Sequence, residues 1–249
     1  MPYATVNGIR LHFEQRGQGA PLLLIPGSLG TGATDFGPQL EEVSPDFLVI
    51  APDPRGYGQS RPPERDFPID YLQRDADDMW ELMRVLGYPS FNVAGWSDGA
   101  TSALLLTITH PASVLKMAIW GASSYISRED LEMIERTRSI AHWSPRMRKS
   151  LETVYGESLQ HLWSGFCDWA QNIYQGGGEI CRARLHAIRC PTLILHGQLD
   201  PLVPEFHPRI IHESIANSRI HVFPTGRHNP HLALANEFNQ VLRNFLQVS

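Results

Sequence analysis

The sequence is poor in cysteine. Only three cysteines occur among the 249 residues, at positions 167, 181 and 190. Their number is odd, their spacings match no zinc-binding pattern, and no Cys-x-x-Cys pair is present. A disulfide framework and a structural zinc site are therefore disfavoured. We expect reduced thiols, in the core or at the surface, and a reducing compartment.

Other signals are missing as well. No apolar run reaches the length of a membrane span. The N-terminus, MPYATVNGIRLHF, has neither an apolar secretory core nor an Arg/Ser-rich leader, so we expect a cytoplasmic location unless a targeting segment was removed. The net charge is −5 without blocks of like charge, which argues against nucleic acid or an anionic membrane as a partner. The glycine-rich stretch 53–60, DPRGYGQS, lacks the lysine of a phosphate loop, and we interpret it as a tight structural turn.

Short apolar runs alternate with helical patterns along most of the chain. Asn7-Gly8 between two β-rich runs predicts a hairpin, and the wholly apolar runs at 21–25 and 47–52 predict strands buried on both faces. Helical spacing over 70–86 ends at Gly87, a plausible C-cap. The alternation predicts an α/β fold with a mostly parallel central sheet and helices on both faces.

The segment 124–183 breaks this alternation. It carries helical patterns at 129–143 and 158–174 with no strand between them, followed by a glycine-rich loop at 175–179. We interpret it as a helical cap inserted between two parts of one core, 1–123 and 184–249. Aromatic residues in the cap suggest an apolar acyl pocket; the candidates to line it are Trp143, Trp163, Phe166 and Trp169.

One stretch carries a catalytic motif. In VAGWSDGAT, residues 93–101, Ser97 stands between Gly95 and Gly99, with strand-like sequence before it and helical sequence after it. This is the strand–turn–helix context that the G-x-S-x-G motif requires, because the turn exposes the serine hydroxyl at the start of a helix. The motif makes Ser97 a candidate nucleophile and predicts the α/β-hydrolase fold.

A serine nucleophile needs a base, and the base needs an acid that orients it. In this fold the chain order is Ser, then Asp or Glu, then His. Asp200 and His228 each follow a predicted strand and satisfy this order. His196 precedes the acid and His231 falls where the last helix begins, so we interpret both as structural residues.

The oxyanion formed during acyl transfer needs two backbone N–H donors. One belongs to the residue after the nucleophile, which is Asp98. The other comes from the loop after an early strand, where Ser28 is the candidate and Leu29 its neighbour. No metal or organic cofactor is required by this chemistry.

Taken together, PGSLGTGATDFGPQL, DPRGYGQSRPPERDFP, GWSDG, KMAIWGAS, HGQLDPLVPEFH and GRHNPHL resemble the biphenyl hydrolase-like (valacyclovir hydrolase) family of α-amino acid ester hydrolases. The resemblance extends over most of the chain and is weakest at 156–178. It implies Ser97 as nucleophile, Asp200 and His228 as its partners, and Asp98 as acceptor of the substrate's α-ammonium group. The chain departs from the family at Ser28, where methionine is usual, and at Ala100, where glycine is usual. Mammalian members also carry an N-terminal mitochondrial leader, and we do not expect their mitochondrial location to carry over to this chain.

An acid beside the nucleophile would oppose the developing oxyanion. Two unit charges about 4 Å apart interact by roughly 4 kcal/mol at an effective dielectric constant of about 20. An α-aminoacyl ester removes this penalty, because its ammonium group pairs with Asp98 and orients the scissile carbonyl. We therefore expect a small-molecule ester with a free α-amino group as substrate, an aminoacyl-enzyme intermediate, and a monomeric enzyme.

Several alternatives remain on this fold. A carbon–carbon bond hydrolase would act on acidic diketones, which Asp98 would repel. A general carboxylesterase would ignore the amine, and a non-catalytic ligand receptor would show no turnover. Asp98 itself could cap the following helix or point to solvent.

Overall fold

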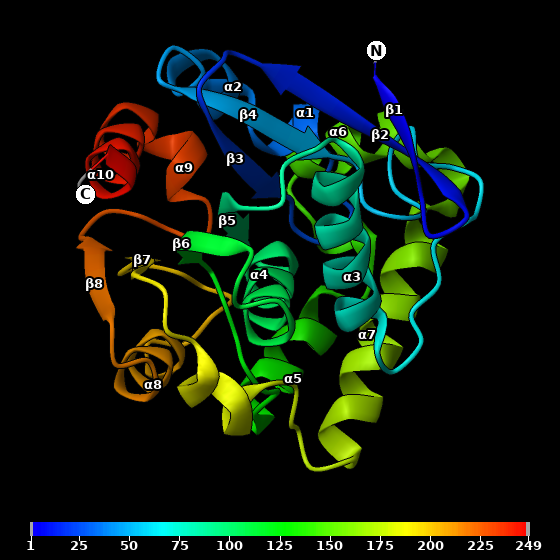
Figure 1. Cartoon of the computed structure of the whole chain (residues 1–249). Coiled ribbons are helices and arrows are strands. Elements are labelled where there is room, and N and C mark those ends of the chain that lie inside the picture. Colours follow the sequence, from blue (N-terminus) through cyan, green and yellow to red (C-terminus); the bar gives the residue numbers. More distant parts are fainter. Residues whose placement is uncertain (1, 248–249) are drawn as a thin grey trace.

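The strands form one eight-stranded sheet in the order β1-β2-β4-β3-β5-β6-β7-β8 (Figure 1). The computed structural model describes residues 2–247. Strands β1 and β2 pair antiparallel, as do β2 and β4, and all other pairs are parallel. The predicted, mostly parallel sheet is therefore confirmed. The strands are β1 (Tyr3–Val6), β2 (Ile9–Arg16), β3 (Ala20–Ile25), β4 (Phe47–Pro52), β5 (Phe91–Trp96), β6 (Val114–Trp120), β7 (Thr192–Gly197) and β8 (Ser218–Phe223).

The N-terminal hairpin turns where the sequence predicts it. Val6 pairs with Ile9, and both turn residues have positive φ, 46° at Asn7 and 80° at Gly8. A two-residue turn with positive φ at both positions suits the right-handed twist of the strands, and Asn-Gly adopts it at little cost.

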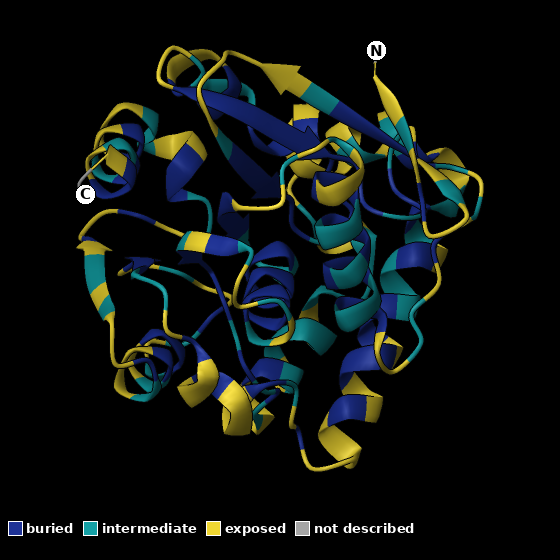
Figure 2. Ribbon diagram, viewed as in Figure 1, coloured by how far each residue is buried: buried dark blue, intermediate teal, exposed yellow. Residues whose placement is uncertain are grey.

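Helices cover both faces of the sheet. On β3, Leu22 and Leu24 pack into a core with α2 and α10, whereas Leu23 and Ile25 face the opposite core with α3 and α4. Figure 2 shows the central strands as mostly buried, while the edge strands β1 and β8 consist largely of exposed and intermediate residues. The helices are α1 (Gly32–Asp35), α2 (Gly37–Glu42), α3 (Tyr71–Val85), α4 (Asp98–Thr109), α5 (Arg128–Thr137), α6 (Pro145–Tyr155), α7 (Leu159–Gln175), α8 (Phe206–Ser214), α9 (Pro230–Ala233) and α10 (Ala235–Gln247), with short 3-10 turns η1 (Ile140–His142), η2 (Gly156–Ser158) and η3 (Arg182–Ala187).

Between β6 and β7 the described chain forms α5, α6 and α7 and no named strand. The predicted helix at 129–143 is too long, because α5 ends at Thr137 and a new helix starts at Pro145, where Ser144 supplies the N-cap. A bridge between Tyr125 and Glu179 joins the two ends of this segment. The predicted boundary at residue 184 falls inside η3, and the division into core and cap stays a prediction.

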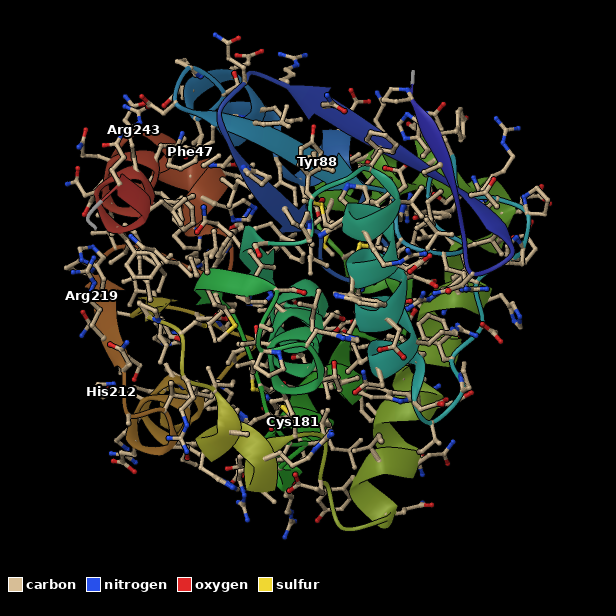
Figure 3. The ribbon with its side chains drawn as sticks, viewed as in Figure 1. Phe47, Tyr88, Cys181, His212, Arg219 and Arg243 are labelled. Carbon is tan, nitrogen blue, oxygen red and sulfur yellow. The ribbon has the colours of Figure 1, made fainter. Side chains whose placement is uncertain are left out.

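The three cysteines are free. Cys167 and Cys181 are buried, and burial raises the pKa of both thiols to about 12. In Figure 3, Cys181, which is fully buried, lies within the outline of the molecule, while Arg219 and His212 lie at its edge. The thiols of Cys167 and Cys181 are therefore protonated and unreactive in this environment.

Within residues 2–247, no helix is long and apolar enough to cross a membrane.

Candidate active site

Ser97 lies on the sharp turn between β5 and α4. Its φ is 55° and its ψ is −121°, a conformation that costs a non-glycine residue about 1–3 kcal/mol. The flanking glycines are required by close backbone contacts. A Cβ at Gly95 would lie 2.3 Å from the carbonyl oxygen of Gly99, and one at Gly99 would lie 2.1 Å from that of Ile25. The motif therefore has a steric cause, and the strained turn exposes the Ser97 hydroxyl.

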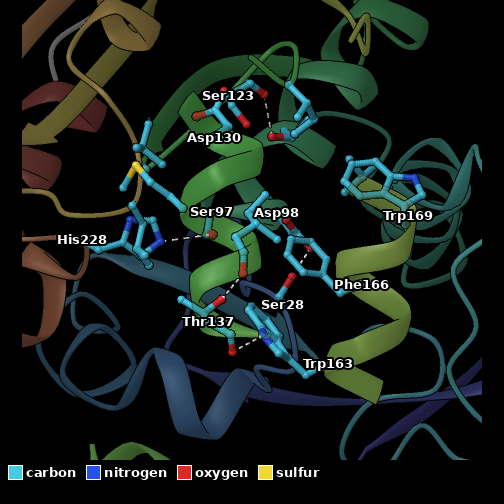
Figure 4. Close-up of a pocket in the computed structure, with 18 of the residues that line it drawn as sticks. Ser28, Ser97, Asp98, Ser123, Asp130, Thr137, Trp163, Phe166, Trp169 and His228 are labelled. Atoms are coloured by element: carbon cyan, nitrogen blue, oxygen red, sulfur yellow. Dashed lines mark hydrogen bonds between the residues drawn. The ribbon is translucent and has the colours of Figure 1, made fainter. Parts of the chain in front are cut away.

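The structure brings Ser97, His228 and Asp200 together. Figure 4 shows the contact between Ser97 and His228. His228 Nε2 lies 3.2 Å from Ser97 Oγ, and its Nδ1 lies 2.9 Å from Asp200 Oδ2. The other oxygen of Asp200 accepts the N–H groups of Leu202 and Val203, at 2.8 and 3.1 Å. Burial by itself would raise the pKa of Asp200, but the hydrogen bonds from His228 and from these two N–H groups outweigh it, and the pKa is lowered. Asp200 is therefore a charged, fixed partner for the imidazole.

Among the described residues, His228 is bonded to Ser97 Oγ, and neither of the two competing histidines is. His231 is buried, and its Nδ1 accepts a hydrogen bond of 2.9 Å from Trp120 Nε1. Burial lowers the pKa of His231 to about 3 and also lowers the pKa of His196. Both rings are neutral at physiological pH, which agrees with their interpretation as structural residues.

The loop after β3 carries the second candidate oxyanion donor. A backbone hydrogen bond of 3.0 Å from Gly30 to Gly27 closes a β-turn, and Leu29 takes a positive φ of 61° at its third position. Asp35 accepts the N–H of Gly27 at 3.0 Å and so fixes the loop from the α1 side. In the described part of the chain, no acceptor takes the backbone N–H of Ser28 or of Asp98. Both donors are therefore free for a ligand.

Asp98 does not cap the helix that it begins. Its Oδ2 accepts hydrogen bonds from Ser28 Oγ and from Tyr71 Oη, the latter at 2.6 Å. Burial raises the pKa of Asp98, while the two hydroxyl groups and the nearby Arg65 lower it in part. The side chain is only partly exposed, and it lines the pocket rather than the outer surface. The capping alternative is therefore wrong.

A pocket of about 310 Å³ opens between the sheet and helices α5–α7 (Figure 4). Ser97, Asp98, Ser28 and His228 lie in its wall. The segment 126–180 contributes a largely apolar wall, in which the polar residues are Asp130, Thr137 and His142. Its apolar members include all four aromatic candidates; they are Ile126, Met133, Ile134, Trp143, Met147, Trp163, Phe166, Trp169 and Ile180.

Sequence reasoning missed two polar residues at this site. In the sequence, Tyr71 is only one of the apolar positions on a predicted helix face, because no local pattern shows where its hydroxyl points. Asp130 lines the pocket from α5, and its carboxylate lies 2.8 Å from Nε2 of the buried His207 on α8. Neither residue belongs to a recognisable motif.

Within residues 2–247, no group of three or more His, Cys, Asp or Glu residues could hold a metal ion.

The fold and this site define an α/β hydrolase. The family model described as alpha/beta hydrolase fold matches residues 20–155. Serine hydrolase BPHL from Homo sapiens is 46% identical over 98% of this chain and 85% of its own length, and the protein of that name from Mus musculus is 44% identical over 98% and 85%. The chain therefore belongs to the α/β hydrolase family and, within it, to the BPHL-type serine hydrolases.

Solved structures agree on the architecture. The meta-cleavage product hydrolase CumD from Pseudomonas fluorescens superposes with a TM-score of 0.82, is 20% identical, and covers 99% of this chain and 97% of that chain. The enol-lactonase from Burkholderia xenovorans has a TM-score of 0.79 at 21% identity, with 99% and 100% covered. At such low identity these likenesses concern the fold alone.

Proposed function

We propose that this serine hydrolase cleaves carboxylic esters of α-amino acids with a free α-amino group. The observation that carries the proposal is the carboxylate of Asp98, next to Ser97 in the chain and open to the same pocket. The remaining pocket wall is largely apolar, so an uncompensated anion there disfavours neutral and anionic esters. An α-ammonium group, one carbon from the scissile carbonyl, supplies the missing charge.

The reaction follows from the positions of the side chains. His228 Nε2, 3.2 Å from Ser97 Oγ, takes the hydroxyl proton as Oγ attacks the ester carbonyl. The negative charge that develops on the carbonyl oxygen is stabilised by the backbone N–H groups of Ser28 and Asp98. The carbon–oxygen bond to the alcohol then breaks, and His228 returns the proton to the leaving alcohol. Water, activated by the same histidine, hydrolyses the aminoacyl-enzyme and regenerates Ser97.

The test compares two substrates and four enzymes. We would measure kcat/KM for valine benzyl ester and for its des-amino counterpart with wild type, Asp98→Asn and Asp77→Asn. Asp77 is a half-exposed acid on α3 outside the pocket, so its variant makes the same change of charge elsewhere. Ser97→Ala provides the background rate.

We expect wild type and Asp77→Asn to prefer the amino ester by about a hundredfold or more, as a pairing energy of about 3–4 kcal/mol implies. Asp98→Asn should lose this preference while it still hydrolyses the des-amino ester, because the amide keeps the backbone N–H. A wild type that treats both esters alike would refute the aminoacyl specificity and leave a general carboxylesterase.

A further inference from the structure

Both hydroxyl groups that contact Asp98 bind the same oxygen atom. Ser28 Oγ and Tyr71 Oη donate to Oδ2, and no described residue donates to Oδ1. Figure 4 shows Ser28 beside Asp98. Because Asp98 is partly exposed and lines the pocket, Oδ1 is available to a bound group. One oxygen of the carboxylate is thus anchored to the protein, and the other has no hydrogen-bond donor among the described residues.

The anchors come from separate parts of the chain. Ser28 lies in the loop after β3, Tyr71 is the first residue of α3, and Asp98 is the first residue of α4. Two donors from different directions leave the carboxylate one orientation, although an aspartate side chain otherwise rotates readily about its last bond. An ion pair with a fixed ligand depends on such fixed geometry.

Tyr71 is itself firmly held. Its ring is fully buried and packs edge-on against Phe67 and Trp169, with ring centroids 5.2 and 4.8 Å apart. The Arg65 guanidinium lies 4.7 Å from the Tyr71 ring centroid and binds Asp75 through two hydrogen bonds of 2.8 and 2.7 Å. Burial raises the pKa of Tyr71 well above its ordinary value, so the phenol stays protonated and remains a donor.

We propose that Tyr71 and Ser28 are positioning residues for substrate selection: they hold Oδ2 of Asp98 so that Oδ1 receives the α-ammonium group. This inference rests on the proposed aminoacyl ester hydrolysis and adds the residues that set its selectivity. It also gives a role to the stretch 53–69, which contributes Arg65 and Phe67 to the support of Tyr71 and which the triad chemistry does not use.

The alternative is that Tyr71 only fills space and satisfies its own buried hydroxyl. The two possibilities differ in what a loss of the hydroxyl does. If Tyr71 only fills space, loss of its hydroxyl changes the hydrolysis of both esters equally, because it acts through the fold. If Tyr71 positions Asp98, the loss slows the hydrolysis only of the ester that carries an ammonium group.

Tyr57 offers a matched control. It is also a buried tyrosine, and its ring lies on the same guanidinium, with Arg65 Cζ 4.4 Å from the ring centroid. Its buried hydroxyl makes no hydrogen bond to Asp98. Tyr57→Phe therefore repeats the chemical change in the same cluster without touching the carboxylate.

The experiment measures kcat and KM for valine benzyl ester and its des-amino counterpart, from pH 5 to 8, with wild type, Tyr71→Phe, Ser28→Ala and Tyr57→Phe. We expect Tyr71→Phe and Ser28→Ala each to lower kcat/KM for the amino ester by about tenfold to a hundredfold, the usual effect of one hydrogen bond to a charged group. The des-amino ester should change by less than about threefold in Tyr71→Phe. The ratio between the two esters should fall in both Tyr71→Phe and Ser28→Ala, whereas Tyr57→Phe should keep the wild-type ratio.

The pH profile adds a second readout. Each hydroxyl lowers the pKa of Asp98, so its removal lets the carboxylate take up a proton at higher pH. For the amino ester only, the acid side of the kcat/KM profile should therefore move to higher pH in Tyr71→Phe and Ser28→Ala.

Failure of this inference and failure of the proposed function give different results. A wild type that prefers the amine, with variants that keep the full preference or lose activity on both esters equally, overturns the positioning role alone. A wild type without preference overturns both. If Tyr71→Phe fails to fold, Ser28→Ala decides between these outcomes, because a serine-to-alanine change in a loop leaves the backbone N–H in place.

Discussion

Gly121 places a strict steric limit beside the proposed catalytic base. It follows β6 with a φ of 59°, and a Cβ at this position would lie 2.8 Å from Cε1 and 3.2 Å from Nδ1 of His228. Carbon atoms in contact are usually about 3.5–4.0 Å apart. In Gly121→Ala the imidazole must therefore retreat by about 0.7–1.2 Å, or the β6–α5 connection must move.

This displacement would weaken the hydrogen bond between His228 and Ser97, which is already long. His228 Nε2 and Ser97 Oγ are 3.2 Å apart, and beyond about 3.5 Å a hydrogen bond is effectively lost. A misplacement of about 1 Å in a catalytic group can cost about a hundredfold in rate. We expect kcat for Gly121→Ala to fall by about that factor on both an amino ester and a neutral ester such as p-nitrophenyl acetate.

Stability should change much less. A non-glycine residue in the left-handed region costs about 1–2 kcal/mol, and about 2–4 °C in Tm accompanies each kcal/mol in a protein of this size. Gly87→Ala is the matched control, because Gly87 has a φ of 86° and, apart from its two neighbours in the chain, no described residue has an atom within 4 Å of the position that its Cβ would take. It should show a similar loss in Tm and wild-type activity.

The assay is steady-state kinetics together with thermal unfolding followed by circular dichroism. Full activity in Gly121→Ala with a Tm like that of Gly87→Ala would refute the reasoning, because the backbone would then have absorbed the methyl group without moving His228. If Gly121→Ala fails to fold while Gly87→Ala folds, the contact between the new methyl group and His228 lowers the stability of the protein rather than misaligning the imidazole.

Three further predictions follow from the same structure. Asp200→Asn should lower kcat by about 10⁴-fold with an unchanged circular dichroism spectrum, because the amide no longer holds His228 in the required tautomer; a loss below tenfold would contradict this role. Burial raises the pKa of Asp35 to about 7, so the folded protein keeps a proton that the unfolded chain loses near pH 4. Wild-type stability should therefore fall as the pH rises from about 4 to about 7 and then level off, whereas Asp35→Asn should lack this fall in urea titrations; parallel pH curves would disprove it. Asp130→Ala leaves the buried His207 without its carboxylate partner, so we expect the free energy of unfolding to drop by about 1–3 kcal/mol. An unchanged urea midpoint would contradict this expectation.

Much of the site could be predicted from local sequence. Ser97, Asp200 and His228 each follow a strand that is recognisable by its apolar residues, and parallel strands bring their carboxyl ends to one edge of the sheet. The G-x-S-x-G spacing encodes the sharp turn because larger residues at Gly95 and Gly99 would collide with backbone oxygens. Such features depend on a few neighbouring residues, so the sequence pattern carries them directly.

The contacts around Asp98 needed the tertiary structure. Tyr71 occupies an apolar position in the helical pattern, and only the packing of α3 against α4 turns its hydroxyl toward the carboxylate. Ser28 contributes a side-chain donor that no local motif predicts, because it lies 70 residues from Asp98 in the sequence. The sequence by itself determined the elements, the fold and the order of the candidate triad, because periodicity and turn chemistry are local. The folded chain decided which oxygen of Asp98 is anchored and which is open, because that choice depends on directions set by side chains far apart in sequence.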